Sequence, residues 1–405
     1  MPSPRLDFLA PYQADLDALR GRERFRALSG RRGLDFASND YLGLAESMEY
    51  RETARAALAR GVPLGAGGSR LLRGNHPEHE ALEQEAARFF GSESALFFGA
   101  GFSANEALLA TLPQRGDIIL YDELIHASAH EGMRLSRATS RAVAHNDAGA
   151  FEDAVRAADG PGRVWIVVES LYSMDGDIAP LETLAGIAGR HGAFLLIDEA
   201  HATGVLGPGG RGLAHGLEGR DDIITLHTCG KALGLAGALV CLPRVLREFL
   251  INRCRNFIFA TAPSPLLAAA IRAALGVIER ADDRRDALAE RVRGVGEALR
   301  RLTDAEPSGT HIQPVIVGSD KRALALAERM QGHGHDIRAI RPPTVPEGTA
   351  RLRISLTLNV SDVQTDAMIA LLAQELAALP SSAHPEGTDA PSARPEGTGV
   401  LPDAL

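Results

Sequence analysis

The segment most informative about the fold is Phe194-Leu195-Leu196-Ile197-Asp198-Glu199-Ala200-His201. Four apolar residues followed directly by an acid are typical of a buried parallel strand that runs into a polar loop. In open α/β sheets, ligands bind at the carboxyl ends of such strands. The pattern therefore predicts that Asp198 and His201 lie at the ligand-binding edge of a parallel sheet.

A second apolar run begins at Ile223 and leads into Thr228-Cys229-Gly230-Lys231. As a neighbouring strand, it would bring Lys231 to the same edge as Asp198 and His201. A lysine that forms a Schiff base and an aspartate that pairs with a pyridinium nitrogen are what a pyridoxal 5'-phosphate (PLP) enzyme needs. The three side chains predict a PLP site, whereas the ordinary alternatives are a helix-capping Asp198 and a solvated Lys231.

Strands and helices alternate along most of the chain, which predicts a largely parallel, doubly wound α/β sheet with right-handed connections. Strands are expected at residues 95–98, 117–121, 164–169, 194–197, 223–226 and 238–242. The first of them runs into Gly99-Ala100-Gly101-Phe102 and a helix from about Glu106, an arrangement that points backbone N–H groups at a phosphate. Because the G-x-G-x-x-G spacing is absent, a nicotinamide enzyme is poorly supported.

The rest of the chain suggests an arm, a second domain and a tail. We expect an N-terminal helix and arm over residues 1–45, a PLP-binding large domain over 46–265 and a small C-terminal domain over 266–380. A long helical segment from Pro265 to about Leu302 would join the two domains. The small domain would be α+β, with strands at 312–317 and 351–356 and helices at 322–331 and 363–379. Residues 381–405, rich in Pro, Gly, Ser and Ala, are expected to be disordered.

The bulk properties narrow the class of protein. The 405 residues are 45% hydrophobic and 23% charged, as in an ordinary globular protein. The net charge of -9 argues against binding to nucleic acid. The three cysteines, Cys229, Cys241 and Cys254, form no C-x-x-C pair, which favours a reducing compartment. No apolar run approaches the ~18 residues of a membrane span, and the first twenty residues do not resemble a signal peptide. We expect a cytoplasmic protein without a metal.

Four motifs in order resemble the α-oxoamine synthases, a group within the fold-type I PLP enzymes. The resemblance runs from about Arg20 to Leu379 and implies a homodimer with shared active sites. The motifs are Ser38-Asn39-Asp40-Tyr41-Leu42-Gly43-Leu44, Tyr172-Ser173-Met174-Asp175-Gly176-Asp177, Asp198-Glu199-Ala200-His201 and Thr228-Cys229-Gly230-Lys231.

The resemblance implies a role for each residue near the cofactor. Lys231 would form the Schiff base and later move the Cα proton, for which its pKa must be lowered. Asp198 would keep the ring nitrogen protonated, His201 would hydrogen-bond the phenolic oxygen and His126 would stack on the ring. The other implied cofactor contacts are Gly101, Phe102, Ser173, Thr228 and Glu169, with Thr261 donated by the second subunit.

The resemblance also implies substrate contacts. Arg353 would clamp the amino-acid carboxylate, because a planar guanidinium binds carboxylates bidentately. Arg351 lies on the same face of the predicted strand and is the alternative. The remaining implied contacts are Asn39, Thr344 and Arg20, the last at the distal carboxylate of the acyl chain in competition with Arg22 and Arg24.

The stretch from Ile337 to Arg353 is most similar to the branch that condenses L-alanine with a pimeloyl thioester, on CoA or an acyl-carrier protein, in biotin biosynthesis. Branches that make 5-aminolevulinate, 2-amino-3-oxobutyrate or a sphingoid base share most of the named residues and stay open. A catalytically silent partner subunit is the alternative from another class of protein. Such a subunit would be expected to lose the Schiff-base lysine, which is present here.

Overall fold

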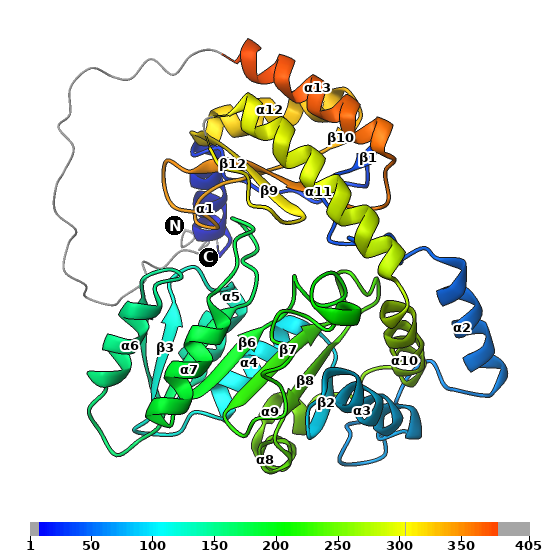
Figure 1. Ribbon diagram of the computed structural model, residues 1–405, viewed down its shortest axis with the longest axis vertical. Helices are drawn as coiled ribbons and strands as arrows, with labels where there is room; N and C mark the ends of the chain where they lie inside the picture. The colour runs from blue at the N-terminus through cyan, green and yellow to red at the C-terminus, as the bar shows by residue number, and fades with distance from the viewer. Residues whose placement is uncertain (1–7, 304, 380–405) are drawn as a thin grey trace, which may run out of the picture.

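The computed structural model describes residues 8–303 and 305–379. These residues form a seven-stranded sheet, a three-stranded sheet and a two-stranded sheet. Figure 1 shows the large sheet with its helices below and the smaller sheets above, joined along one side by α10 (Pro265–Glu279) and α11 (Asp282–Leu302). The expected disordered tail, 381–405, lies outside the described residues, and the domain boundaries at 45, 265 and 380 stay predictions.

The large sheet has the strand order β2-β8-β7-β6-β5-β3-β4 and is mostly parallel. β8 is the exception, because it pairs antiparallel with both of its neighbours. The doubly wound α/β class predicted from the alternating pattern is confirmed. Its strands are β2 (Ser94–Phe98), β3 (Ile118–Asp122), β4 (Thr139–Val143), β5 (Val164–Glu169), β6 (Phe194–Asp198), β7 (Ile223–Thr228) and β8 (Ala238–Leu242).

Helices cover both faces of this sheet because alternate strand residues point to opposite sides. In β6, Leu196 packs into one core cluster, whereas Leu195 and Ile197 pack into another. The first face is covered by α4 (Gly101–Thr111), α5 (Ala127–Leu135), α8 (Arg244–Arg253) and α9 (Arg255–Ile258). The second face is covered by α3 (Pro77–Phe90), α6 (Ala148–Arg156) and α7 (Leu181–His191), and α10 packs against α3.

Two helix boundaries differ from those expected from the sequence. Helix α4 begins at Gly101 rather than near Glu106, since Ala100 is extended and serves as the N-cap. The segment expected to be one helix from Pro265 to about Leu302 is two, separated at Arg280 and Ala281. The second of them starts with two aspartates in its first turn, where negative charge favours a helix start.

The smaller sheets lie in the C-terminal part of the chain. β12 (Ala350–Ser355) is the centre of the antiparallel sheet β11-β12-β9, in which β9 is Ile312–Gly318 and β11 is Arg338–Ile340. Helices α12 (Asp320–Gly332) and α13 (Asp362–Ala378) pack near it. β1 (Leu34–Asp35) pairs with β10 (His335–Asp336), so the N-terminal arm is tied to this part.

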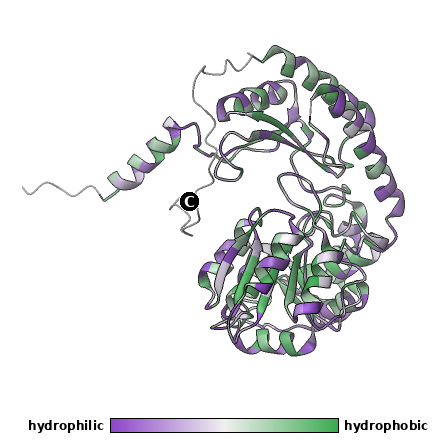
Figure 2. Ribbon diagram, turned by 60° about the vertical axis from the view of Figure 1, so that its left-hand side comes forward, coloured by the Kyte–Doolittle hydropathy of each residue, from purple (hydrophilic) through white to green (hydrophobic). Residues whose placement is uncertain are grey.

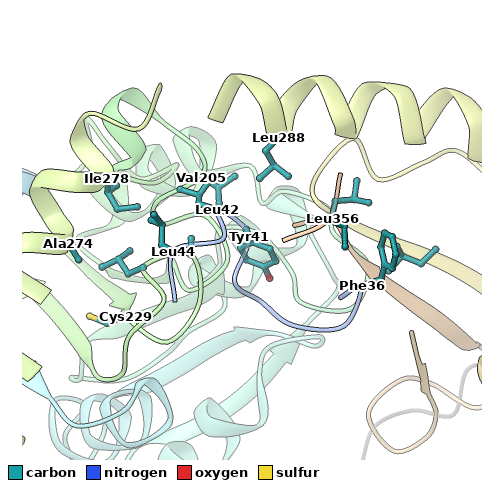
Figure 3. Close-up of a cluster of buried hydrophobic side chains, with 14 of the residues drawn as sticks. Phe36, Tyr41, Leu42, Leu44, Val205, Cys229, Ala274, Ile278, Leu288 and Leu356 are labelled. Atoms are coloured by element: carbon teal, nitrogen blue, oxygen red, sulfur yellow. The ribbon is translucent and has the colours of Figure 1, made fainter. Parts of the chain in front are cut away.

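The arm after β1 runs between the two parts of the molecule. Phe36, Tyr41, Leu42 and Leu44 are almost fully buried in one hydrophobic cluster. Figure 3 shows Tyr41 between Leu42 and Leu44 on one side and Phe36 on the other. Backbone hydrogen bonds from Ser355 and Leu358 to the arm fix it against the small sheet. This position brings the arm to the loop edge of the large sheet.

The remaining helices are peripheral. α2 (Met48–Ala59) packs against α10, and α1 (Ala10–Gly21) has no buried residue. Figure 2 shows α1 projecting away from the body of the molecule, and the strands of the large sheet coloured as hydrophobic. Among the helices of residues 8–303 and 305–379, none combines the length and apolar character that crossing a bilayer requires.

Candidate active site

Lys231 lies in the turn after β7 and is partly buried. It is one of two lysines in the chain, the other being Lys321 on the surface of α12. Its Nζ is 2.6 Å from His201 Nε2. Burial lowers the pKa of Lys231 to about 8, against the opposing effect of the Asp198 and Glu169 carboxylates. A substantial fraction of the amine is therefore neutral near pH 8, as a nucleophile or base must be.

Asp198 is the last residue of β6 and is buried. Its Oδ2 accepts a hydrogen bond of 2.6 Å from Asn105 Nδ2, and its Oδ1 accepts one of 2.9 Å from the Ala200 N–H. Asn105 also donates to Ser128 Oγ at 3.0 Å. The carboxylate is thus held by neutral donors, and no ion pair within 4.0 Å engages it among the described residues. Asp198 and Lys231 act on each other electrostatically, so they share one site.

Glu169 ends the neighbouring strand β5 and is paired in register with Asp198. Burial, and then the Asp198 carboxylate, raise the pKa of Glu169 to about 8, whereas Lys231 opposes this effect. Its Oε1 is buried and has no hydrogen-bond partner within the described part of the chain. Buried polar atoms in folded proteins are nearly always paired, so this atom is open to a partner on a bound group.

His126, Phe102 and Gly101 come together from α4 and α5. His126 caps α5 and its Nδ1 is 2.8 Å from Ser128 Oγ, while its ring meets that of Phe102 edge-on at 6.4 Å between centroids. A Cβ on Gly101 would lie 3.2 Å from Thr228 Oγ1. The N-cap of α4 supplies no side-chain hydrogen bond. The first N–H groups of α4 therefore have no capping side chain and lie beside Thr228.

Arg353 lies on β12 and is buried, with 7% of its surface exposed. All four of its hydrogen-bond acceptors are neutral: Ser173 O at 2.5 Å, Ser355 Oγ at 2.7 Å, Asn39 Oδ1 at 3.2 Å and the Tyr41 hydroxyl at 3.5 Å. Arg351, the alternative clamp, is different because it already pairs with the Asp175 carboxylate. A buried cation without an anion costs much free energy, so Arg353 is the better receptor for an incoming carboxylate.

Tyr41 connects the two halves of this site. Its hydroxyl is 2.6 Å from His201 Nδ1 and 2.9 Å from Asn39 Oδ1. The sequence contained Tyr41 within the motif from Ser38 to Leu44 but gave no reason to assign it a role. Asn105 and Ser128, which hold Asp198 and His126, were missed in the same way. The sequence pointed to them only by their positions: Asn105 is the last residue of the Gly-rich segment, and Ser128 stands two residues after His126.

Three residues proposed from the sequence make no hydrogen bond or ion pair with this cluster. Thr261 is exposed and helps line a separate cavity of about 440 Å³ with Gly99 and Ser103. Arg20 is exposed on α1, where it pairs with Asp17 and covers the ring of Phe25. Thr344 lines a cavity of about 100 Å³, whose other residues are Arg24, Arg26, Ala339, Ile340, Arg341 and Pro342. Arg24, Arg26 and Arg341, but not Arg20, line this cavity with Thr344.

The residues present fit PLP. The cofactor carries an aldehyde, a phenolic oxygen, a ring nitrogen and a phosphate. The site offers the Lys231 amine, the His201 imidazole and the Asp198 carboxylate, and α4 offers N–H groups without a capping side chain. The unpartnered Glu169 Oε1 lies in the same cluster. For each functional group of the cofactor expected from the sequence, the protein therefore offers a matching group.

The sequence of the chain matches known proteins over most of its length. Residues 31–371 match the family model described as aminotransferase class I and II. An 8-amino-7-oxononanoate synthase of Chromobacterium violaceum is 42% identical over 383 residues, which are 91% of this chain and 98% of that protein.

Two solved structures show the same architecture. A serine palmitoyltransferase structure that contains PLP superposes with a TM-score of 0.84 at 25% identity, over 92% of this chain and 99% of the other. An 8-amino-7-oxononanoate synthase of Francisella tularensis superposes with a TM-score of 0.72 at 28% identity, over 85% of this chain and 98% of the other.

Proposed function

Because the chain belongs to the aminotransferase class I and II family, we propose that it catalyses the PLP-dependent, decarboxylative condensation of L-alanine with a pimeloyl thioester. The products are 8-amino-7-oxononanoate, CO2 and the free thiol carrier, which is CoA or an acyl-carrier protein. The reaction belongs to biotin biosynthesis. Relatives more than 40% identical over nearly the whole chain support this choice within the family.

The observation that carries the proposal is the buried Arg353, which has no carboxylate partner among the residues described. A free amino acid brings a carboxylate, and the guanidinium fork can bind it bidentately. Arg353 is linked through Asn39 and Tyr41 to the site of Lys231. An α-amino acid held by Arg353 would thus place its amino group and Cα toward the lysine.

When bound, PLP supplies an electron sink that stabilises negative charge at the substrate Cα. The chain's own residues do the rest. Asp198 would hold positive charge at the ring nitrogen of bound PLP, and His201 would hydrogen-bond its phenolic oxygen. The lysine amine, with its lowered pKa, takes the Cα proton and later returns one. Burial of these groups keeps water away and strengthens their electrostatic effects.

We propose further that the enzyme is a cytoplasmic homodimer with shared active sites. Thr261 supports this because it makes no hydrogen bond to the Lys231 cluster of its own chain and lies exposed at the surface. Phe259, two residues earlier, is also largely exposed, as an interface residue would be in a free chain. The three cysteines are free and buried, which fits a reducing compartment.

Turnover measurements with purified protein test the proposal. L-Alanine, glycine and L-serine are compared as amino acids against pimeloyl thioester, and shorter acyl thioesters are compared with L-alanine held fixed. We expect L-alanine and the pimeloyl chain to give the highest kcat/KM. Preference for glycine or L-serine would contradict the proposal.

The second candidate is another α-oxoamine synthase, in particular one that uses L-serine. The observation that favours it is the higher TM-score with serine palmitoyltransferase, 0.84 against 0.72 for the Francisella tularensis protein. Its weakness is the lower identity, 25% against 42% for the Chromobacterium violaceum relative. The amino-acid comparison above distinguishes the two.

A further inference from the structure

The hydroxyl of Tyr41 is the centre of a buried hydrogen-bond chain. Tyr41 has no exposed surface, and its hydroxyl is 2.6 Å from His201 Nδ1, 2.9 Å from Asn39 Oδ1 and 3.5 Å from Arg353 Nη2. On the far side of the imidazole, His201 Nε2 is 2.6 Å from Lys231 Nζ. One continuous path therefore joins the amine of Lys231 to the guanidinium of Arg353.

The chemistry of the donors gives this path a direction. A lysine ammonium can only donate, so His201 Nε2 must accept from it. His201 is neutral because burial, and then the charges of Lys231 and Arg353, hold its pKa well below the usual range. Its single proton therefore lies on Nδ1 and is donated to the Tyr41 oxygen.

The remaining proton in the path belongs to the Tyr41 hydroxyl. It has one acceptor left, the amide oxygen of Asn39, which also accepts from Arg353. Each hydrogen bond of the path then joins one donor to one acceptor. The reverse direction, with the Tyr41 hydroxyl donating to His201, would place an N–H of the imidazole against the ammonium and is excluded while Lys231 is charged.

We propose that Tyr41 is a positioning residue whose hydroxyl fixes the tautomer of His201 and thereby supports the charged form of Lys231. The proposal concerns the same site as the proposed function but does not depend on which amino acid or thioester is used. Its basis is the pair of short contacts on either side of the His201 ring, together with the complete burial of Tyr41.

Other charges also act on Lys231, so the hydroxyl is one contribution among several. Asp198 and Glu169, which end β6 and β5, favour the ammonium. Arg353 on β12 opposes it. His126 at the start of α5, and His311 just before β9, complete the groups around the amine, and burial holds the pKa of His311 at about 3. Substitution of Tyr41 leaves all of these charges in place.

The pKa of the Lys231 amine in the full-length, cofactor-stripped protein tests the proposal. It is obtained from the pH dependence of reductive methylation, followed by mass spectrometry of the peptides. Because the chain has two lysines, Lys321 gives a reference peptide in the same sample. The variants are Tyr41→Phe, which retains the ring, and Asn39→Ala, which removes the acceptor of the hydroxyl proton. Tyr50→Phe is the matched control, since Tyr50 is also buried but its hydroxyl has no partner within the described residues.

We expect Tyr41→Phe to lower the pKa of Lys231 by roughly 0.5 to 1 unit, the effect of one net hydrogen bond. Asn39→Ala should lower it in the same direction, although Asn39 makes no contact with Lys231, and Tyr50→Phe should leave it unchanged. An unchanged or higher pKa in Tyr41→Phe overturns the proposal. Equal shifts in Tyr41→Phe and Tyr50→Phe also overturn it, because they would show a packing effect. Absence of L-alanine turnover in the wild type would instead count against the proposed function and leave this measurement intact.

Discussion

Lys231 is partly buried and Lys321 is exposed, so substitutions of the two lysines can be compared to test the role of Lys231. Lys231 is enclosed beside His201, whereas Lys321 is exposed on α12. We predict that Lys231→Ala lowers turnover by roughly 10³-fold or more, because the proposed covalent and proton-transfer roles both need the amine. Lys321→Ala should retain wild-type turnover. Steady-state rates of the two variants check this, and substantial activity in Lys231→Ala would contradict the assignment.

Arg353 and Arg351 are neighbours on one face of β12 but have different partners. Arg351 is neutralised by Asp175, whereas Arg353 has neutral acceptors only. We predict that Arg353→Lys raises the KM for the amino acid roughly tenfold to a hundredfold, because a lysine cannot make the bidentate contact. Arg351→Lys should change this KM by less than about twofold while lowering thermal stability. The reverse pattern would show that Arg351 is the clamp.

Asp198 and Lys231 could be predicted from the strand pattern of the sequence, whereas the hydrogen-bonding residues Tyr41 and Asn105 could not. Asp198 and Lys231 each follow an apolar run, so the strand pattern alone directs them to one edge. Tyr41 and Asn105 have the ordinary appearance of buried polar residues in a loop and a helix. Tyr41 contacts His201 and Asn105 contacts Asp198, and each pair is separated by more than 90 positions in the sequence. No local sequence pattern encodes such contacts.

At the scale of elements, one histidine ties a loop to the large sheet. His145, which follows β4, contacts Asp122 at the end of β3 through Nδ1 at 2.9 Å and Asp177 through Nε2 at 2.6 Å. Asp177 ends the segment that includes Ser173, whose carbonyl accepts from Arg353. The position of the Arg353 guanidinium therefore depends in part on this ion-paired histidine.

The ion pairs of His145 predict a pH dependence of stability. Burial lowers the pKa of His145, but the hydrogen bonds and charges of Asp122 and Asp177 outweigh it and raise the pKa to about 10 from an ordinary 6.5. Because the folded pKa is the higher one, the stabilisation is complete below about pH 6.5 and is lost as the pH rises through about 10. We predict that His145→Gln lowers the free energy of unfolding by roughly 1 to 3 kcal/mol at pH 6.

Urea denaturation at several pH values checks this prediction. The difference between wild type and His145→Gln should shrink as the pH is raised through about 10. Arg115→Gln, at an exposed turn, serves as the control. Its free energy of unfolding should differ little from that of the wild type at every pH. A difference for His145→Gln that grows with pH would contradict the assignment of the charged form.

The elements themselves were predictable where the apolar pattern is strong. The β6 and β8 strands are continuous apolar runs, and their expected positions agree with the structure to within one residue. β4 was not anticipated, because Thr139-Ser140-Arg141-Ala142-Val143 is an edge strand with one buried residue and no alternation. The break between α10 and α11 was also missed, since Arg280 and Ala281 are good helix formers and only the following aspartates signal a new start.

At the scale of the whole molecule, the homodimer is the remaining proposal. We predict that Thr261→Ala weakens PLP binding roughly fivefold to a hundredfold, as the loss of one contact to phosphate would. Thr139→Ala, at an exposed residue of β4, should leave affinity unchanged. Cofactor titration followed by absorbance measures both variants. Equal affinity in wild type and Thr261→Ala would contradict the shared site.

Hybrid dimers determine which subunit supplies Thr261. If the residue is donated across the interface, a hybrid of one Lys231→Ala subunit and one Thr261→Ala subunit has one site with both changes and one with neither. We expect such hybrids to show wild-type cofactor affinity at their intact site. If Thr261 instead served the site of its own subunit, the one site of the hybrid that retains Lys231 would lack Thr261 and would bind PLP weakly.

We propose that Lys231 bonds to PLP at the loop edge of the large sheet, and reductive trapping of this bond is the sharpest test of the site. The PLP-loaded protein is treated with borohydride, digested and analysed by mass spectrometry for pyridoxyl-modified lysine. We expect stoichiometric modification of Lys231 and none of Lys321. Modification of Lys321 instead, or a fully loaded protein with no modified lysine, would contradict it.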